Sequence, residues 1–270
     1  MTTFWLKIIA MATMVTDHAA IAFFDEALWL RVIGRLAFLI YAFLIAEGFR
    51  HYRDDPKRVR KHVIRMALVM VVSEFACDYF DKQIWVNWAE QSVIPTLFLG
   101  LMGLWFTEFL RGKSVEAYGA ERDPATSRPP LRGGYIAICL LVWGVLAWIS
   151  YAINSQYKIV GVLLILLFYV YRDQTDGEDF RLLERLVHYI AILTAFVVFH
   201  VAVEVGFEYV LLVFERSTTI WPLTFGMLAT AVPLALYNGK VGYKNRVLNE
   251  LYGWFYPIQF FAIIAIRALL

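Results

Sequence analysis

The chain has 270 residues, of which 60% are hydrophobic and only 18% are charged. Soluble domains carry roughly 25% charged residues, so this composition excludes an ordinary soluble domain and is typical of a polytopic membrane protein. The net charge of +2, without a basic tail, gives no sign of a nucleic-acid-binding protein.

Apolar runs of roughly membrane-spanning length follow one another along the chain, and a transmembrane helix needs about 20 mostly apolar residues. We expect an all-α, polytopic transmembrane bundle that forms a single integral membrane domain over residues 1–270. The first run lacks a basic start and an A-x-A site, so we interpret it as a retained helix and not as a signal peptide. About nine spans are predicted, at 4–24, 28–49, 61–80, 93–110, 134–154, 157–172, 185–203, 219–237 and 250–268.

The polar segment 111–133, rich in Gly and Pro, is predicted to be a cytoplasmic loop. Lys and Arg residues favour cytoplasmic loops, and this rule orients the bundle. With the N-terminus in the cytoplasm, 17 of the 25 Lys and Arg residues lie on the cytoplasmic side and only five on the opposite side. We therefore predict a cytoplasmic N-terminus. Cys77 and Cys139 lie inside apolar runs, which is typical of small core residues and not of a disulfide or a metal site.

Ionisable residues from separate spans share one predicted depth, in the outer half of the membrane. Their positions are Asp17, His18, Arg35, Glu74, Asp78 and His200. A charged residue at the centre of a membrane helix costs at least ~2.5–3.5 kcal/mol on insertion scales, so such residues usually pair or serve a function. The pattern predicts that the helices gather these groups in one polar, water-filled pocket.

Simpler interpretations stay open for several of these residues. A salt bridge from Arg35 to Glu74 or Asp17 would join the helices without any catalytic role. His200 lies in an apolar stretch and is better explained as a packing residue. Glu47, near the inner end of its span, can simply reach the interface. The basic segment 50–61 is most simply an orientation signal, and binding of anionic phosphates is the alternative.

Several sequence blocks resemble one family of membrane proteins. They are LKIIAMATMVTDH, IGRLAFLIYAFLIAEGF, SEFACD, VIPTLFLGL, VGVLLILLFY, LALYNGKVG and WFYPIQ, which together extend over about residues 5–265. In these blocks the chain resembles the TraX family, which is named for a conjugative pilin acetylase of the inner membrane. The resemblance implies acetyl transfer from acetyl-CoA to a membrane-anchored acceptor such as a pilin N-terminus. It also implies that His18 is central, with Asp17, Arg35, Glu47 and Glu74 as the matching polar positions.

Two positions depart from the pattern of that family. The family's last span usually reads Tyr-Pro-x-His, whereas this chain has Gln259 at the final position. A family Asp-Tyr-Gly before the sixth span is replaced here by Gln156, Tyr157 and Lys158. Gln259 can form hydrogen bonds but cannot carry a proton near neutral pH.

Acetyl transfer requires that the acceptor lose a proton and that the developing oxyanion be stabilised. His18 suits proton removal because an unperturbed histidine has a pKa of about 6.5. Neighbouring helical residues point about 100° apart, so Glu74 is a better candidate than Asp17 to orient His18. Arg35 is the candidate for oxyanion stabilisation.

The acetyl-CoA donor would approach from the cytoplasm, where Lys240 and Asn238, in the YNGK turn, are candidates to hold it, together with Glu47. The acceptor would be a pilin-like peptide or a lipid-linked amine that reaches the site from outside or from the bilayer. A proton-coupled transporter uses the same buried residue types. A non-catalytic membrane assembly protein is the third hypothesis.

Overall fold

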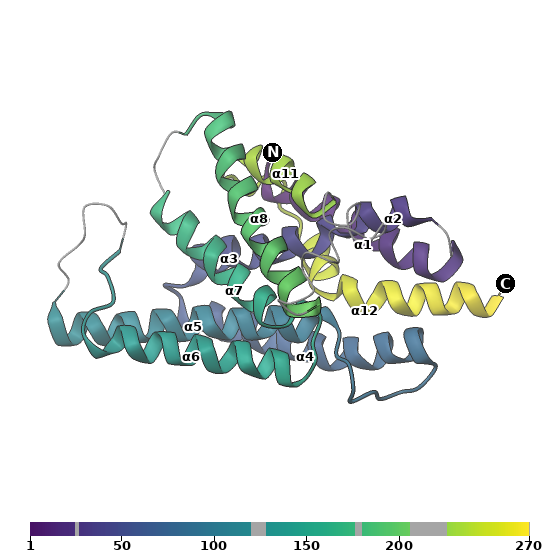
Figure 1. Cartoon of the computed structure of the whole chain (residues 1–270), viewed down its shortest axis with the longest axis horizontal. Helices are drawn as coiled ribbons and strands as arrows, with labels where there is room; N and C mark the ends of the chain where they lie inside the picture. The colour runs from purple at the N-terminus through teal and green to yellow at the C-terminus, as the bar shows by residue number, and fades with distance from the viewer. Residues whose placement is uncertain (25–26, 120–127, 176–179, 206–225, 270) are drawn as a thin grey trace. The chain divides into compact units, whose positions relative to one another are not determined.

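The computed structural model describes residues 1–24, 27–119, 128–175, 180–205 and 226–269 (Figure 1). Within these ranges the secondary structure is helical, and a single β-bridge joins Gln91 to Ser155. The all-α prediction is therefore confirmed. The helices are α1 (Thr3–Phe23), α2 (Leu28–Gly34), α3 (Leu36–Tyr52), α4 (Pro56–Lys82), α5 (Val93–Tyr118), α6 (Gly134–Ala152), α7 (Lys158–Gln174), α8 (Leu182–Val205), α11 (Ala231–Ala235) and α12 (Arg246–Leu269).

Among the described residues, six helical stretches are long and apolar enough to cross a membrane. They are Thr3–Phe23, Leu28–Tyr52, Val93–Tyr118, Gly134–Ala152, Leu182–Val203 and Val247–Leu269. The spans predicted at 61–80, 157–172 and 219–237 are not among them. α4 is long enough, but it begins with PKRVRK and carries acidic residues near its other end, while α7 has only 17 residues. Part of 219–237 lies outside the described residues. The helix α5 also continues to Tyr118, eight residues beyond its predicted end, so part of the predicted loop 111–133 is helical.

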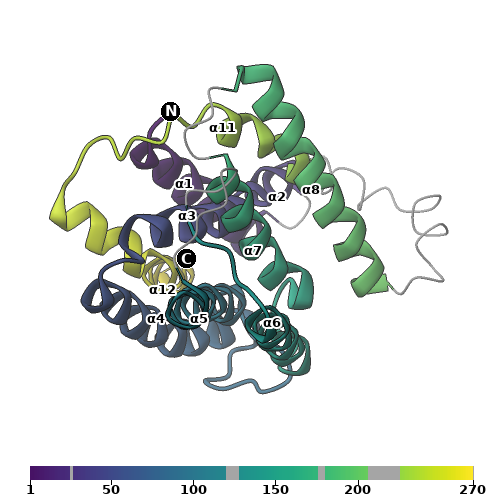
Figure 2. The ribbon, with the colours of Figure 1, turned by 90° about the vertical axis from the view of Figure 1, so that its left-hand side faces the viewer.

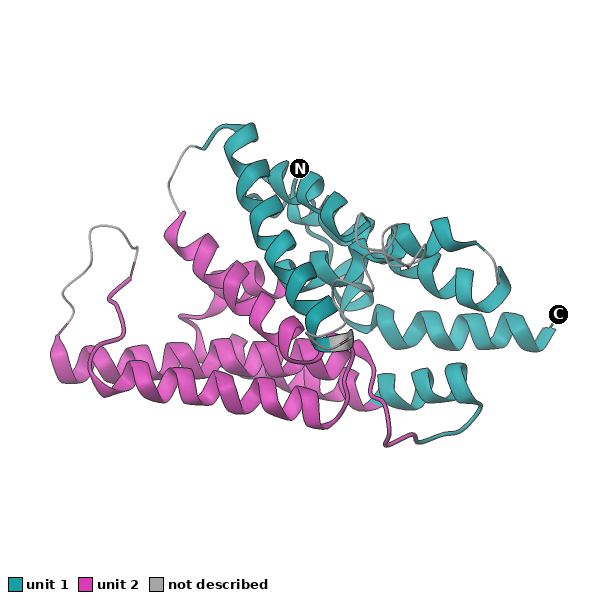
Figure 3. Ribbon diagram, in the orientation of Figure 1, with its two compact units in different colours: residues 1–44, 72–86, 180–270 teal, residues 45–71, 87–179 magenta. Residues whose placement is uncertain are grey.

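The chain forms two compact units (Figure 3). The first unit contains residues 1–44, 72–86 and 180–270, and the second contains residues 45–71 and 87–179. The helices α3 and α4 each contribute to both units. This division leaves the predicted single membrane domain over residues 1–270 as a prediction.

In the first unit, α1 packs closely against α2 and α12, and α8 packs against α11. Gly34 lies directly against α1, because a Cβ atom added there would be only 2.3 Å from the Cβ of Asp17. The start of the chain pairs with the turn before α12: the Thr3 N–H donates to the Lys240 carbonyl at 2.9 Å, and the Asn238 N–H donates to that of Met1 at 2.9 Å. The N-terminus and the YNGK turn therefore lie at one end of this unit.

The second unit is built on α5, α6 and α7, which pack against one another (Figure 2). Small residues permit the close approach, as is common between membrane helices. An added Cβ would be 2.2 Å from Ile165 at Gly100 and 2.6 Å from Trp143 at Gly103. Lys158, which replaces the family's glycine, has a φ of +39°, a conformation that favours glycine.

Contacts join the ends of helices within the second unit. In the second unit, Arg53 contacts Asp173 at one end, and Gln91 pairs with Ser155 at the other. The segments that the charge rule assigns to the cytoplasm thus meet each other. The orientation of the N-terminus with respect to the membrane stays a prediction.

Candidate functional site

Asp17 and His18 lie near the end of α1 in the first unit, where α2 gives way to α3. Close packing of Asp17 on Gly34 places this carboxylate beside the short break that Arg35 forms between the two helices. Arg35 has a half-buried side chain with a buried Nε atom. The structure therefore brings together the parts of the chain that carry Asp17, His18 and Arg35.

The imidazole of His18 is surrounded by aromatic rings from two other helices. Its ring centroid lies 4.4 Å from that of Phe260 and 5.9 Å from that of Tyr256, both on α12. On α4, the ring of Phe80 lies 6.2 Å away. The Gln259 side chain approaches the imidazole from the same helix as Phe260. His18 thus lies in an aromatic environment in which a polar neighbour comes from the last helix.

Several polar atoms of the first unit are buried without a hydrogen-bond partner among the described residues. They include Asp17 Oδ1, His18 Nδ1, Arg31 Nε, Tyr41 Oη, Ser73 Oγ, Arg185 Nε, Thr230 Oγ1, and both Nε2 and Oε1 of Gln259. Ser73 is fully buried and Gln259 is only 4% exposed. Most buried polar groups in proteins are hydrogen-bonded, so such atoms are candidates for ligand binding.

The ring contact that α4 makes with His18 comes from Phe80. Glu74 lies on a face of α4 that also carries Cys77, Asp78 and Asp81. On this face the Cys77 thiol donates to Asp81 at 3.6 Å. Orientation of His18 by Glu74 stays a prediction. His200 stacks on Phe196, with ring centroids 5.7 Å apart and an interplanar angle of 7°, as expected of a packing residue.

The residues proposed to hold the acyl donor fall in different units. Asn238 and Lys240 are exposed, in the turn that pairs with the N-terminal segment, and the Asn238 side chain accepts a hydrogen bond from the Lys240 N–H at 3.1 Å. Nearby along α1, the Lys7 ammonium donates to Asn249 at 3.0 Å and lies over the Tyr252 ring. Glu47 lies in the second unit.

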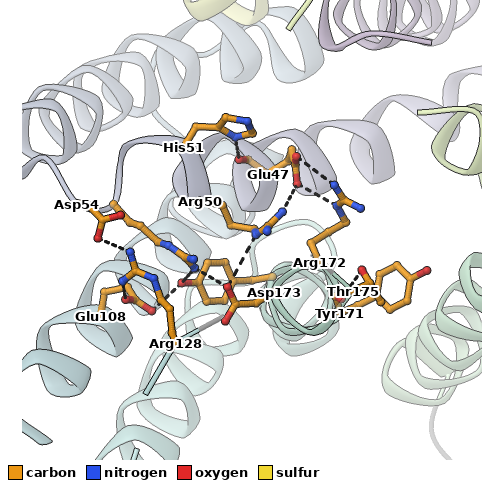
Figure 4. Close-up of polar contacts among 12 residues, drawn as sticks. Glu47, Arg50, His51, Asp54, Glu108, Arg128, Tyr171, Arg172, Asp173 and Thr175 are labelled. Carbon is orange, nitrogen blue, oxygen red and sulfur yellow. Dashed lines mark hydrogen bonds and ion pairs between the residues drawn. The ribbon is translucent and has the colours of Figure 1, made fainter. Parts of the chain in front are cut away.

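Glu47 belongs to an ion-pair network at one end of the second unit (Figure 4). Arg172 donates to its two carboxylate oxygens at 3.0 and 3.3 Å, and Arg50 donates at 3.0 Å. The side chain of Glu47 is only 3% exposed. Two guanidinium groups therefore compensate this buried carboxylate.

Tyr169 continues the network from α3 to α5. Its hydroxyl accepts from Arg53 and donates to Glu108, each at 2.6 Å. Arg53 also donates to Asp173 at 2.8 Å. Burial acts to lower the pKa of Arg53, but the neighbouring Tyr169 and Asp173 raise it above its usual value, so the guanidinium stays charged.

A loop segment completes the network. Arg128 donates to Glu108 at 2.7 Å and also contacts Asp54. Arg111 donates to the Pro129 carbonyl at 2.7 Å. Sequence reasoning missed Tyr169, Glu108 and Asp173 as partners, although the acidic residue Glu108 inside a predicted span is a signal that could have identified it.

The fold and the buried polar groups define a helical membrane protein with several membrane-spanning segments. The profile of the TraX protein family matches residues 3–267, nearly the whole chain, so the chain belongs to the TraX family. This confirms the resemblance found in the sequence. A 58-residue stretch, 20% of the chain, is 40% identical to the probable fimbrial assembly protein FimC, serogroup H1, from Dichelobacter nodosus. That stretch covers only 24% of the relative's length. No solved structure matches the chain.

Proposed function

We propose that the protein is a membrane-embedded acyltransferase that moves an acetyl group from cytoplasmic acetyl-CoA to an amine or hydroxyl of a membrane-associated acceptor. The observation that carries the proposal is that Asp17, His18 and Gln259 of the first unit each have a buried polar atom without a hydrogen-bond partner among the described residues. A histidine kept among aromatic rings, with a buried nitrogen that has no partner among the described residues, is suited to accept a proton from a bound substrate.

In the proposed step His18 removes a proton from the acceptor amine as its nitrogen attacks the thioester carbonyl carbon. A C–N bond forms, and the C–S bond then breaks. The CoA sulfur leaves and takes up the proton from His18, which returns to its neutral form. The products are an amide and free CoA, and no further reactant is needed. Arg35 is proposed to stabilise the developing negative charge on the carbonyl oxygen.

The donor is proposed to bind by its phosphates at the end of the first unit that carries the N-terminus. Lys240 and Asn238 are exposed there, and Lys7 adds a second positive charge on α1. Glu47, by contrast, is already compensated by Arg50 and Arg172, which supports a structural use of that residue.

The acceptor is proposed to be a pilin-like, membrane-anchored peptide in the inner membrane of a bacterium. Support comes from membership of the TraX family and from the partial similarity to a probable fimbrial assembly protein. A lipid-linked amine would satisfy the same chemistry.

The test is transfer of radiolabelled acetyl groups from acetyl-CoA to a membrane-anchored peptide with a free N-terminus, using purified protein in vesicles. We expect label on the peptide with the wild type and a loss of at least ~10²-fold with His18→Ala, which is the lower range for general base catalysis. The matched control is His200→Ala, since His200 is a span histidine that stacks on Phe196. Equal transfer by both variants would remove His18 from the proposed role, and proton uptake without acetyl transfer would favour a transporter.

A further inference from the structure

We infer that the carboxamide of Gln259 binds the reacting groups beside His18: its amide N–H donates to the acetyl carbonyl oxygen, and its carbonyl oxygen accepts from the acceptor N–H. The inference rests on the proposed function and adds a substrate-binding residue on α12.

Gln259 is placed on the α12 face that meets His18. Tyr256 and Phe260 both contact the imidazole, and Gln259 lies three residues after the first and next to the second. Residues three and four apart share one face of a helix. The side chain of Gln259 is therefore held on the side of α12 that carries the two ring contacts.

The amide of Gln259 is deeply buried and lies close to the His18 imidazole. It is 4% exposed, and neither Nε2 nor Oε1 has a hydrogen-bond partner among the described residues. A buried amide that is left unpaired lowers the stability of the fold, and an apolar side chain of similar size avoids this penalty. A glutamine at this position therefore lowers the stability of the fold unless a ligand forms hydrogen bonds with its amide.

The chemistry of the amide identifies the kind of ligand. A primary amide offers N–H donors and a carbonyl acceptor side by side. A thioester carbonyl supplies an acceptor, and an attacking amine supplies a donor. The two substrates of the proposed reaction can therefore form hydrogen bonds with both the N–H and the carbonyl oxygen of the Gln259 amide. A hydrocarbon chain can form neither.

Pro257 adds a local feature two residues earlier. A proline inside a helix has no N–H to donate to the carbonyl four residues before it, which here belongs to Gly253. The α12 backbone is thus less constrained beside Gln259 than in an uninterrupted helix.

The test compares Gln259→Leu with the wild type in two measurements. The first is the melting temperature of the purified protein without ligand. We expect Gln259→Leu to melt at a higher temperature, because the variant buries no unpaired amide. The matched control is Gln91→Leu, since Gln91 donates to the carbonyls of Asn87 and Glu90 at 2.8 and 3.1 Å and its loss should not stabilise the protein. A lower melting temperature of Gln259→Leu would show a structural role and overturn the inference.

The second measurement separates the acetyl group from the rest of the donor. Acetyl-CoA contains the thioester carbonyl and CoA does not. We expect acetyl-CoA to raise the wild-type melting temperature more than CoA does, and the two to act equally on Gln259→Leu. Equal shifts in the wild type, or an unchanged difference in Gln259→Leu, would overturn the inference.

Transfer activity distinguishes this inference from the proposed function. Loss of one preorganised oxyanion donor typically lowers kcat by ~10²–10³-fold, and we expect Gln259→Leu to lose transfer on this scale. Transfer by Gln259→Leu within twofold of the wild type would overturn the inference but leave the proposed function intact. A wild type that transfers no acetyl group, yet shows the expected melting shifts, would defeat the proposed function and leave the acetyl-binding role of Gln259.

Discussion

The two compact units treat their buried polar groups differently. In the second unit, Glu47, Arg53, Glu108 and Asp173 join in one network of ion pairs and hydrogen bonds, although Arg53 Nε itself has no hydrogen-bond partner among the described residues. In the first unit, Asp17, His18, Ser73 and Gln259 each have a buried polar atom without a partner among the described residues. A paired charge can hold helices together, whereas an unpaired group costs stability unless a ligand binds it. The comparison supports a structural use of the network and is consistent with the chemistry proposed for the first unit.

The strongest test of this contrast is Glu47→Ala in the second unit. Removing the carboxylate leaves Arg172 and Arg50 without a shared partner in a buried position, and breaking a buried pair typically costs about 3–5 kcal/mol. We expect the free energy of unfolding to fall by about this amount, measured by titration with a denaturing detergent.

The matched control is Glu116→Ala, which removes an exposed ion pair with Lys113 on α5. Exposed pairs contribute little, so we expect no measurable change. If Glu47→Ala were as stable as the control and instead failed to respond to CoA, Glu47 would be a ligand-binding residue and the contrast would be wrong.

A second test addresses the first unit through Gly34→Ala. The added methyl group would lie 2.3 Å from Asp17 Cβ, so α1 and α2 must separate locally. Overpacking of this kind typically costs about 1–3 kcal/mol. We expect both the free energy of unfolding and acetyl transfer to decrease, because Asp17 and His18 shift with α1.

Gly48→Ala is the control for this variant, since an added Cβ there would meet only Tyr52, at 3.8 Å. Alanine is favoured over glycine in helices by roughly 0.5–1 kcal/mol, so this control should be neutral or stabilising. Normal stability and transfer in Gly34→Ala would mean that the close contact of α1 with α2 does not position the site.

Six of the nine predicted spans correspond to helices that are long and apolar enough to cross a membrane, because such helices are determined by local composition. Asp17 and His18 were identified for the same reason, as polar residues inside an apolar run. The break at Gly34 and Arg35 was not predicted, since it depends on the packing of α1 against α2. The helical extension to Tyr118 was missed because this polar segment lacks the apolar signal of a span.

Contacts between residues far apart in the sequence could not be predicted either. Tyr169 joins Arg53 and Glu108, which are 116 and 61 residues away in the sequence. No local spacing encodes such a contact. Gln259 was recognised only as a departure from a family pattern, and its buried, unpaired state required coordinates.

The smallest test concerns a paired polar contact inside the second unit that is not part of the ion-pair network. Trp143 on α6 donates from Nε1 to the Thr107 hydroxyl on α5 at 2.9 Å. Thr107→Val keeps the shape and removes the acceptor. Double-mutant cycles on polar contacts between membrane helices give about 0.6 kcal/mol on average, up to ~1.7. We expect a coupling energy in this range from Thr107→Val, Trp143→Phe and the double variant, with acetyl transfer unchanged in Thr107→Val. A loss of transfer without a loss of stability would place a functional residue in the second unit, and the division of roles between the units would then have to be abandoned.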